Sequence, residues 1–186
     1  MKNLFIIPGF GENASSSRYK KLITTATQNG YSIIKVPIQW KYRTMNDYIS
    51  QFKEFYNKHK TSTDYFLGFS YGAVIIFSSA QELQPKKIFL CSLSNAFKED
   101  MVGIEDKMRK FLGKKGFEDI KTRSAIKIAK NLTIPTILFY GEKEQDLRKR
   151  CEETAKLAKK TKLIIVKDAD HEISHPEYIK AVKNNL

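Results

Sequence analysis

Short apolar runs alternate along the chain with longer stretches in which apolar positions recur every three or four residues. The runs are nearly continuous in hydrophobicity, as parallel strands covered on both faces are, and the longer stretches have the period of amphipathic helices. The runs predict strands over residues 4–7, 32–36, 65–67, 87–91, 136–140 and 163–166. The stretches predict helices over residues 16–28, 45–58, 71–83, 146–160 and 176–183.

This order of strands and helices predicts an α/β fold built on one open sheet. Strands that alternate with helices form a doubly wound, mostly parallel sheet, here six-stranded, with helices on both faces. The chain has 186 residues, which is the length of one domain, so we expect a single domain over residues 1–186.

Residues 95–131 interrupt the alternation after the fourth strand. The segment is charged and partly amphipathic, and because long insertions on such sheets often carry function, it predicts a helical lid. Met101, Ile104, Met108 and Phe111 follow one another at helical spacing and predict one apolar stripe. The stripe either packs on the helices of the sheet or covers a binding pocket, and the sequence leaves both interpretations open.

The formal charge of +13 raises the question of a nucleic-acid partner. Of the 33 basic residues, 27 are lysines, and they are spread along the whole chain among acidic residues. Dispersed lysines are typical of a solvated surface, whereas a phosphate-binding patch gathers them on one face. Since the aromatic signatures of RNA-binding modules are also missing, we expect no nucleic-acid partner.

Cysteine usage and the N-terminal residues bear on the compartment. Cys91 and Cys151 stand far apart without a C-x-x-C partner, which excludes a disulfide framework and a four-ligand zinc site. This usage suits a reducing, cytoplasmic environment, and with no metal-ligand spacing or phosphate-binding motif we expect neither metal nor cofactor. The apolar run at residues 4–7 is too short for a signal peptide or a membrane helix, so we expect no membrane span.

The first chemical motif is Gly68-Phe69-Ser70-Tyr71-Gly72. It follows a predicted strand and opens a predicted helix, which is the context that a G-x-S-x-G nucleophile turn requires. Glycines on both sides remove the Cβ atoms that would collide in such a sharp turn. Ser70 is therefore the candidate nucleophile.

A serine nucleophile needs a base, and the chain has three histidines. His171 follows the last predicted strand, at the carboxyl edge of the sheet where open α/β folds bind ligands, so we choose it as the base. His175 just precedes Pro176 at the start of the last predicted helix and is a weaker candidate. His59 lies in a polar helix end and is expected at the surface.

A carboxylate must hold the histidine, and the segment after the fifth strand offers Glu142, Glu144 and Asp146. The order serine, acid, histidine, the G-x-S-x-G turn and the loop at residues 8–11 together resemble the α/β-hydrolase family over nearly the whole chain. In that family the acid often stands three residues after a glycine, which implies Glu144, with Asp146 as the alternative. Glu142 is expected at the surface.

Two backbone N–H groups must stabilise the oxyanion of the tetrahedral intermediate. One is expected from Tyr71, the residue after the nucleophile. The resemblance implies that the second comes from the loop Pro8-Gly9-Phe10-Gly11, and we assign it to Phe10.

Together these residues predict a serine hydrolase of the carboxylesterase or thioesterase type, which cleaves a small-molecule carboxylic ester or thioester through an acyl-enzyme on Ser70. Peptidase and acyl-transferase chemistry use the same residues and stay open. Aromatic and apolar residues expected near the site, among them Trp40, Phe97 and Met101, are candidates either for substrate binding or for ordinary core.

The alternative is a non-catalytic binding module that keeps the same fold. It would hold an acidic partner with basic residues of the insertion, among them Lys114, Lys115, Lys121 and Arg123. The complete set of catalytic parts favours the hydrolase.

Overall fold

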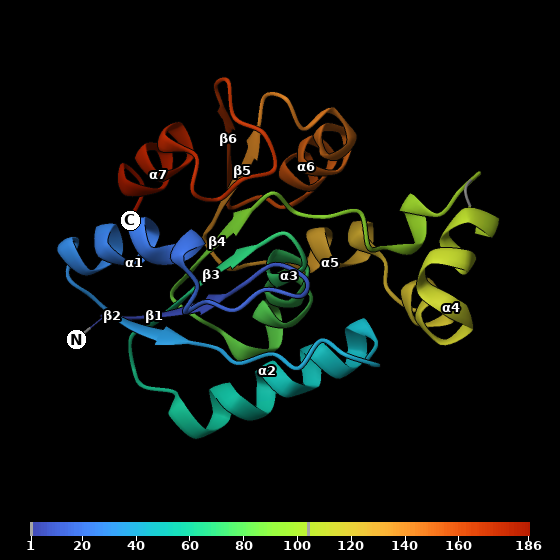
Figure 1. The fold of residues 1–186 in the computed structure, drawn as a ribbon, viewed down its shortest axis with the longest axis horizontal. Helices are drawn as coiled ribbons and strands as arrows, with labels where there is room; N and C mark the ends of the chain where they lie inside the picture. The colour runs from blue at the N-terminus through green and yellow to red at the C-terminus, as the bar shows by residue number, and fades with distance from the viewer. Residues whose placement is uncertain (1, 104) are drawn as a thin grey trace.

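A computed structural model describes residues 2–103 and 105–186 of the chain. Within these residues six strands form one sheet in the order β2-β1-β3-β4-β5-β6, and every neighbouring pair is parallel (Figure 1). The strands are β1 (Lys2–Ile7), β2 (Tyr31–Lys35), β3 (Asp64–Phe69), β4 (Lys87–Cys91), β5 (Thr136–Gly141) and β6 (Thr161–Val166). The predicted six-stranded α/β sheet is confirmed, and it is all-parallel rather than mostly parallel.

Helices cover both faces of the sheet, as predicted. They are α1 (Ser17–Gln28), α2 (Met45–His59), α3 (Tyr71–Leu83), α4 (Glu105–Lys121), α5 (Ala125–Asn131), α6 (Gln145–Leu157) and α7 (Pro176–Lys183). The buried residues of α1 and α7 belong to the core cluster on one face, and those of α2, α3, α5 and α6 to the cluster on the other (Figure 1).

Strand β1 shows why the apolar runs are nearly continuous. Side chains alternate between the two faces of a strand, so Phe5 and Ile7 join the cluster beneath α2 and α3, while Leu4 and Ile6 join the cluster beneath α1 and α7. All four side chains are fully buried. A strand with a core on each side therefore needs apolar residues at every position.

The edge strand β6 begins earlier than the sequence predicts. Thr161 and Lys162 pair in register with Thr136 and Ile137 of β5, although they are polar. Most positions of β6 are only half-buried or exposed, since an edge strand has one open side. Polar residues are therefore tolerated in β6, and a prediction from hydrophobicity alone places the start of the strand too late.

The crossover from β1 outward to β2 and back to β3 creates a switch point in the strand order. The loops that follow β1 and β3 leave the sheet in opposite directions at the carboxyl ends of these strands. In open α/β sheets, ligands bind in the crevice at such a point.

The insertion after β4 is helical, as predicted, but it is not one regular element. It contains a short 3-10 turn (Lys98–Asp100), then α4 and α5, and α4 is interrupted at Gly113, whose φ is 69° and ψ 171°. Met101 ends the 3-10 turn and so precedes α4, which means that the predicted stripe does not lie on one helix. Ile104 and the side chains of Met108 and Phe111 fall outside the described part of the structure.

Both ends of the insertion are anchored in the core. Phe97 and Met101 at its start and Phe117 and Ile120 in the second half of α4 are at most 4% exposed and join the same core cluster as α2 and α3. A lid that swung open as a whole would expose these side chains to water. The lid over residues 95–131 stays a prediction, and these anchors confine its motion to the residues between them.

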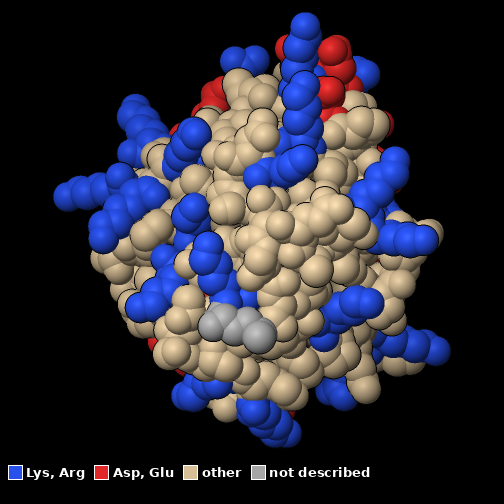
Figure 2. All heavy atoms as spheres, turned by 90° about the vertical axis from the view of Figure 1, so that its left-hand side faces the viewer, with Lys and Arg blue, Asp and Glu red and all other residues tan. Residues whose placement is uncertain are grey.

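Basic side chains are dispersed, rather than gathered in a stripe, on the side of the molecule that Figure 2 shows. Figure 2 shows the side of the molecule on which both chain ends lie: lysines and arginines are scattered there with neutral surface between them, and acidic residues appear mainly at the margin. In the described residues, none of the helices combines the length and apolar composition that crossing a bilayer requires.

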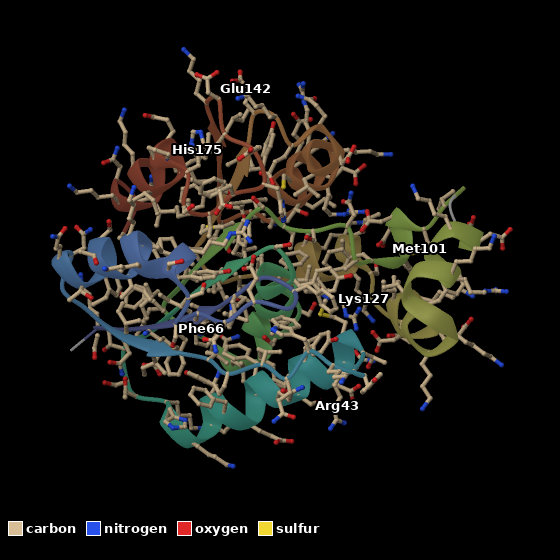
Figure 3. All side chains as sticks on the ribbon, viewed as in Figure 1. Arg43, Phe66, Met101, Lys127, Glu142 and His175 are labelled. Atoms are coloured by element: carbon tan, nitrogen blue, oxygen red, sulfur yellow. The ribbon has the colours of Figure 1, made fainter. Side chains whose placement is uncertain are left out.

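Met101, labelled in Figure 3, is buried, and we predict that it contributes to stability as a core residue. Two variants at neighbouring positions can measure this contribution. Met101→Gln should lower the free energy of unfolding by about 2 kcal/mol, because it places an amide among apolar side chains. Val102→Gln is the matched control, since Val102 is 79% exposed, and should change stability by less than about 0.5 kcal/mol. Equal values in urea denaturation would show that the insertion is not anchored at Met101.

Candidate active site

Ser70 stands in a strained turn between β3 and α3. Its φ of 55° and ψ of −117° lie in a region that non-glycine residues adopt at a cost of about 1–3 kcal/mol. A Cβ at Gly68 would come within 2.4 Å of the Gly72 carbonyl carbon, and a Cβ at Gly72 within 2.2 Å of the Ile7 carbonyl oxygen. Glycine is therefore required at both positions, and the first turn of α3 is pressed against the end of β1.

Hydrogen bonds of the sheet continue into this turn. The Ser70 N–H donates to the Cys91 carbonyl at 2.9 Å, which extends the pairing of β3 with β4 by one residue. Ser70 is also the N-cap residue of α3 and is 8% exposed. Its hydroxyl is thus fixed at the carboxyl edge of the sheet, beside the N-terminus of a helix.

His171 lies next to this hydroxyl. Its Nε2 is 2.9 Å from Ser70 Oγ, and its Nδ1 is 2.5 Å from Glu144 Oε1. The ring of Phe69 packs against the imidazole with centroids 4.9 Å apart, which limits the orientations that the ring can take. The loop between β6 and α7 thus places His171 between Ser70 and Glu144.

The second carboxylate oxygen of Glu144 is held from two sides. Glu144 Oε2 accepts from the Gly141 N–H at 2.5 Å and from the Ser92 hydroxyl at 2.8 Å, and the residue is 6% exposed. Asp146 is exposed in the first turn of α6, and its carbonyl oxygen accepts from the Asn95 side chain. Of the two acids that the sequence left open, the structure therefore brings Glu144 to His171.

The other two histidines have structural surroundings. The His175 side chain accepts from the Glu177 N–H at 3.3 Å and caps the start of α7 (Figure 3). His59 is exposed at the end of α2, where its ring stacks on Phe55. No hydrogen bond in the described residues joins either of them to Ser70.

Nothing in the sequence indicated a role for the segment after β4, which contacts both Glu144 and Ser70. Ser92 is fully buried with a φ of 52°, and besides Glu144 its hydroxyl contacts Tyr178 Oη at 2.8 Å. Burial raises the pKa of Tyr178 well above its ordinary value, so this phenol stays protonated. Ser94 Oγ lies 3.0 Å from Ser70 Oγ.

The loop after β1 lies beside the start of α3. The rings of Phe10 and Tyr71 are 5.2 Å apart, and Glu12 Oε2 accepts from the Gly9 N–H at 3.1 Å, which closes the loop into a tight turn. The Tyr71 N–H is in the first turn of α3, where amides have no partner within the helix. No hydrogen bond in the described residues uses the N–H of Phe10 or of Tyr71.

Arg18 connects this loop to the histidine loop. Its guanidinium forms an ion pair with Glu12 and a second one with Glu172 at 2.7 Å, and it donates to the His171 carbonyl at 3.2 Å. The guanidinium also lies over the Phe69 ring, 5.3 Å from its centroid. Two loops far apart in the sequence are thereby held in a fixed relation to each other.

The surroundings of Ser70 differ on its two sides. Phe10 is 56% exposed and lies 5.6 Å from the ring of Trp40, so these two rings and Tyr71 form an apolar wall beside the loop after β1. On the side of His171 there is a more polar cavity of about 310 Å³. It is lined by Lys143, Glu144, Gln145, Asp146, Leu147 and His171.

Two of the three candidate substrate-binding residues are core residues instead. Phe97 is fully buried with its ring against Phe77, and Met101 is 4% exposed. Each lies behind other side chains in the cluster that supports the insertion, so neither presents a surface to a ligand in this conformation. Only Trp40 remains at the site, where its Nε1 donates to the Glu12 carbonyl at 2.9 Å.

The basic set proposed for an acidic partner also needs correction. Arg123 is 6% exposed and donates to Asp119 at 3.1 Å and to Asn46 at 2.7 Å. Lys121 bonds to Glu118 at 3.2 Å. A buried, paired arginine cannot contact a partner without breaking its ion pair, so Arg123 drops out of this set, whereas Lys114 and Lys115 are exposed.

Other reactive groups do not compete with Ser70. Cys91 and Cys151 are free and buried, and burial raises the pKa of both thiols, that of Cys151 to about 12. Such thiols are not nucleophilic near neutral pH. In the described part of the chain, no group of three or more His, Cys, Asp or Glu side chains could hold a metal ion.

Comparison with known proteins places the fold. No family model matches the sequence, and no curated protein matches it either. Among solved structures, the chain is similar to a putative hydrolase from Agrobacterium vitis S4 with a TM-score of 0.82 and 15% identity, over 99% of this chain and 86% of that one. Est1E from Butyrivibrio proteoclasticus matches with a TM-score of 0.81 and 14% identity, over 99% and 84% of the two chains.

A third structure, a thioesterase domain from the curacin biosynthetic pathway, matches with a TM-score of 0.71 and 11% identity, over 99% of this chain and 90% of that one. The chain therefore has the α/β-hydrolase fold, which it shares with esterases and lipase-like hydrolases over nearly its whole length. The resemblance that the sequence motifs suggested is confirmed at the level of the fold.

Proposed function

We propose that this protein is a serine hydrolase that cleaves a carboxylic ester or thioester through an acyl-enzyme on Ser70. The observation that carries the proposal is the unbroken line of hydrogen bonds from Ser70 Oγ to His171 Nε2 and from His171 Nδ1 to Glu144. Three residues from three different loops form this line at the carboxyl edge of the sheet. Packing alone does not require a serine, a histidine and a carboxylate in that order.

The first half of the reaction forms the acyl-enzyme. Ser70 Oγ attacks the carbonyl carbon while His171 Nε2 takes its proton, and Glu144 stabilises the imidazolium and holds the ring. The oxyanion accepts hydrogen bonds from the N–H groups of Phe10 and Tyr71. Removal of one such donor costs about 3–4 kcal/mol of transition-state stabilisation in a serine protease. His171 then gives its proton to the leaving alcohol or thiol. The second half repeats these steps with water as the nucleophile, releases the acid and restores Ser70.

The apolar wall indicates on which side of Ser70 the acyl group of the substrate would lie. Phe10 carries an oxyanion donor in its backbone and an exposed ring in its side chain, so the group attached to the carbonyl would lie along the rings of Phe10, Tyr71 and Trp40. An aromatic or apolar acyl group would bury that surface. One solved structure of Est1E, which matches with a TM-score of 0.80 and 13% identity, has ferulic acid bound, and this supports an aromatic acid as a first probe. On the opposite side, the polar cavity next to His171 would take the leaving group.

The first test is hydrolysis of p-nitrophenyl esters by the wild type and Ser70→Ala. Loss of the nucleophile should lower kcat by about 10⁶-fold, down to the uncatalysed background, because Ser70 is the residue on which the acyl-enzyme forms. The variant should keep its fold, as circular dichroism would show. A Ser70→Ala protein that kept a tenth of the wild-type rate would overturn the proposal.

Matched controls separate the other two roles within the same assay. His171→Ala should lose nearly as much activity as Ser70→Ala, whereas His175→Ala should stay within about threefold of the wild type. Glu144→Gln should lose about 10⁴-fold, since it can no longer hold the imidazole in the right tautomer, while Asp146→Asn should lose little. If Asp146→Asn were the more damaging change, the role of the acid would pass to Asp146.

We further predict that the Phe10 ring determines preference for the acyl group. Phe10→Ala keeps the backbone N–H, so kcat/KM for acetate esters should change by less than about threefold, while KM for aromatic and long-chain esters should rise about tenfold. Tyr42→Ala is the control, because Tyr42 is 93% exposed and should leave both unchanged. A uniform loss over the whole ester series would mean that Phe10 supports the loop rather than the substrate.

A further inference from the structure

Ser94 places a second hydroxyl beside the proposed nucleophile. Its Oγ is 3.0 Å from Ser70 Oγ, and the two residues are 9% and 8% exposed. The backbone around it is fixed, because Leu93 is fully buried and the Asn95 side chain donates to the Asp146 carbonyl at 2.8 Å. The segment that follows β4 therefore fixes the position of Ser94, and the contact does not depend on a freely rotating surface side chain.

The direction of this hydrogen bond follows from counting protons. Glu144 already accepts two hydrogen bonds through Oε2, so as a carboxylate it also accepts from His171 Nδ1. In the state in which His171 acts as the base under the proposed function, the imidazole is neutral and carries one proton, so Nε2 is an acceptor and takes the hydrogen bond of the Ser70 hydroxyl. Ser70 has no other proton, and the hydroxyl that donates between Ser94 and Ser70 must be that of Ser94.

We propose that Ser94 is a further catalytic residue, whose hydroxyl stabilises the negative charge on Ser70 Oγ as that oxygen leaves the acyl group in deacylation. The inference rests on the proposed function, and it concerns the deacylation step. In the described residues, Ser94 is the other side chain besides His171 that is hydrogen-bonded to this oxygen.

Water attacks the acyl carbonyl carbon and gives a proton to His171 Nε2, which yields a tetrahedral intermediate. The bond between that carbon and Ser70 Oγ then breaks, its electron pair passes to Oγ, and His171 returns the proton to this oxygen. The acid leaves and Ser70 is regenerated. Ser94 keeps its own proton throughout and only strengthens its hydrogen bond while charge grows on Oγ.

Acylation should depend on Ser94 less than deacylation does. In the free enzyme, Ser70 Oγ is a hydroxyl oxygen that already accepts well, so the hydrogen bond from Ser94 gains little when attack begins. In the acyl-enzyme the same atom is an ester oxygen, a weak acceptor, and the hydrogen bond becomes strong only as the bond breaks. Interactions that are stronger in the transition state than in the ground state accelerate a step, so the gain falls on deacylation.

The test measures the two steps separately in Ser94→Ala and Ser94→Thr. Wild type and variants are mixed with p-nitrophenyl acetate, the fast release of p-nitrophenol gives acylation, and decay of the acetyl-enzyme in intact-mass spectra gives deacylation. Ser94→Ala should deacylate at least about tenfold more slowly and acylate within about threefold of the wild type, so that acetyl-enzyme accumulates. Ser94→Thr keeps the hydroxyl and should restore deacylation.

Ser79→Ala is the matched control for loss of a buried serine hydroxyl. Ser79 is fully buried, and its Oγ donates to the Ile75 carbonyl at 2.7 Å within α3, so its removal should leave both steps unchanged. Equal loss of both rates in Ser94→Ala together with a lower melting temperature would show a structural role and overturn the inference, as would unchanged deacylation. A wild type that neither releases p-nitrophenol above the uncatalysed rate nor forms acetyl-enzyme would overturn the proposed function itself, which is a distinct result.

Discussion

The contact between the first turn of α3 and the end of β1 is the constraint on which the site depends. Gly72 lies so close to the Ile7 carbonyl that no side chain fits, and Gly68 lies equally close to Gly72. This contact lets Ser70 adopt a positive φ, directs its hydroxyl to the edge of the sheet, and brings the loop that carries Phe10 next to Tyr71. Strain at Ser70 is sustained because β1, β3 and α3 are all buried around it.

The order of the strands accounts for the rest of the site. Strand β4 lies between β3 and β5, so the residues that follow it stand between Ser70, which follows β3, and Glu144, which follows β5. Ser92 reaches Glu144 and Ser94 reaches Ser70 from this one short segment. In a parallel sheet, polar residues that follow the middle one of three neighbouring strands can therefore contact the residues that follow the strands on either side.

The fold and two residues of the candidate site, Ser70 and His171, could be predicted because each has a local signal. Continuous apolar runs indicated the strands, and the glycines around Ser70 and the position of His171 after the last strand indicated the site. The choice between Glu144 and Asp146 depended on how the chain turns at Gly141, where a glutamate folds back to accept from the Gly141 N–H. That turn has no separate signal in the sequence.

Other parts of the site could not be predicted for physical reasons. Serines in loops are common, and the left-handed backbone at Ser92 shows only in the structure. Phe97 and Met101 are apolar whether they line a pocket or fill the core, and the distinction is set by the packing of the insertion against α2 and α3. The spacing of apolar residues in the insertion also did not indicate that α4 is interrupted at Gly113.

The proposed reaction depends on activation of the Ser70 hydroxyl by His171, which Glu144 holds in place. The most direct measurement is reaction of the purified protein with a fluorophosphonate, followed by intact-mass analysis and peptide mapping, because only an activated serine is expected to react. We expect one label per chain, located on Ser70, and none in His171→Ala. An unlabelled wild type, or a label located on any other residue, would contradict the proposed reaction.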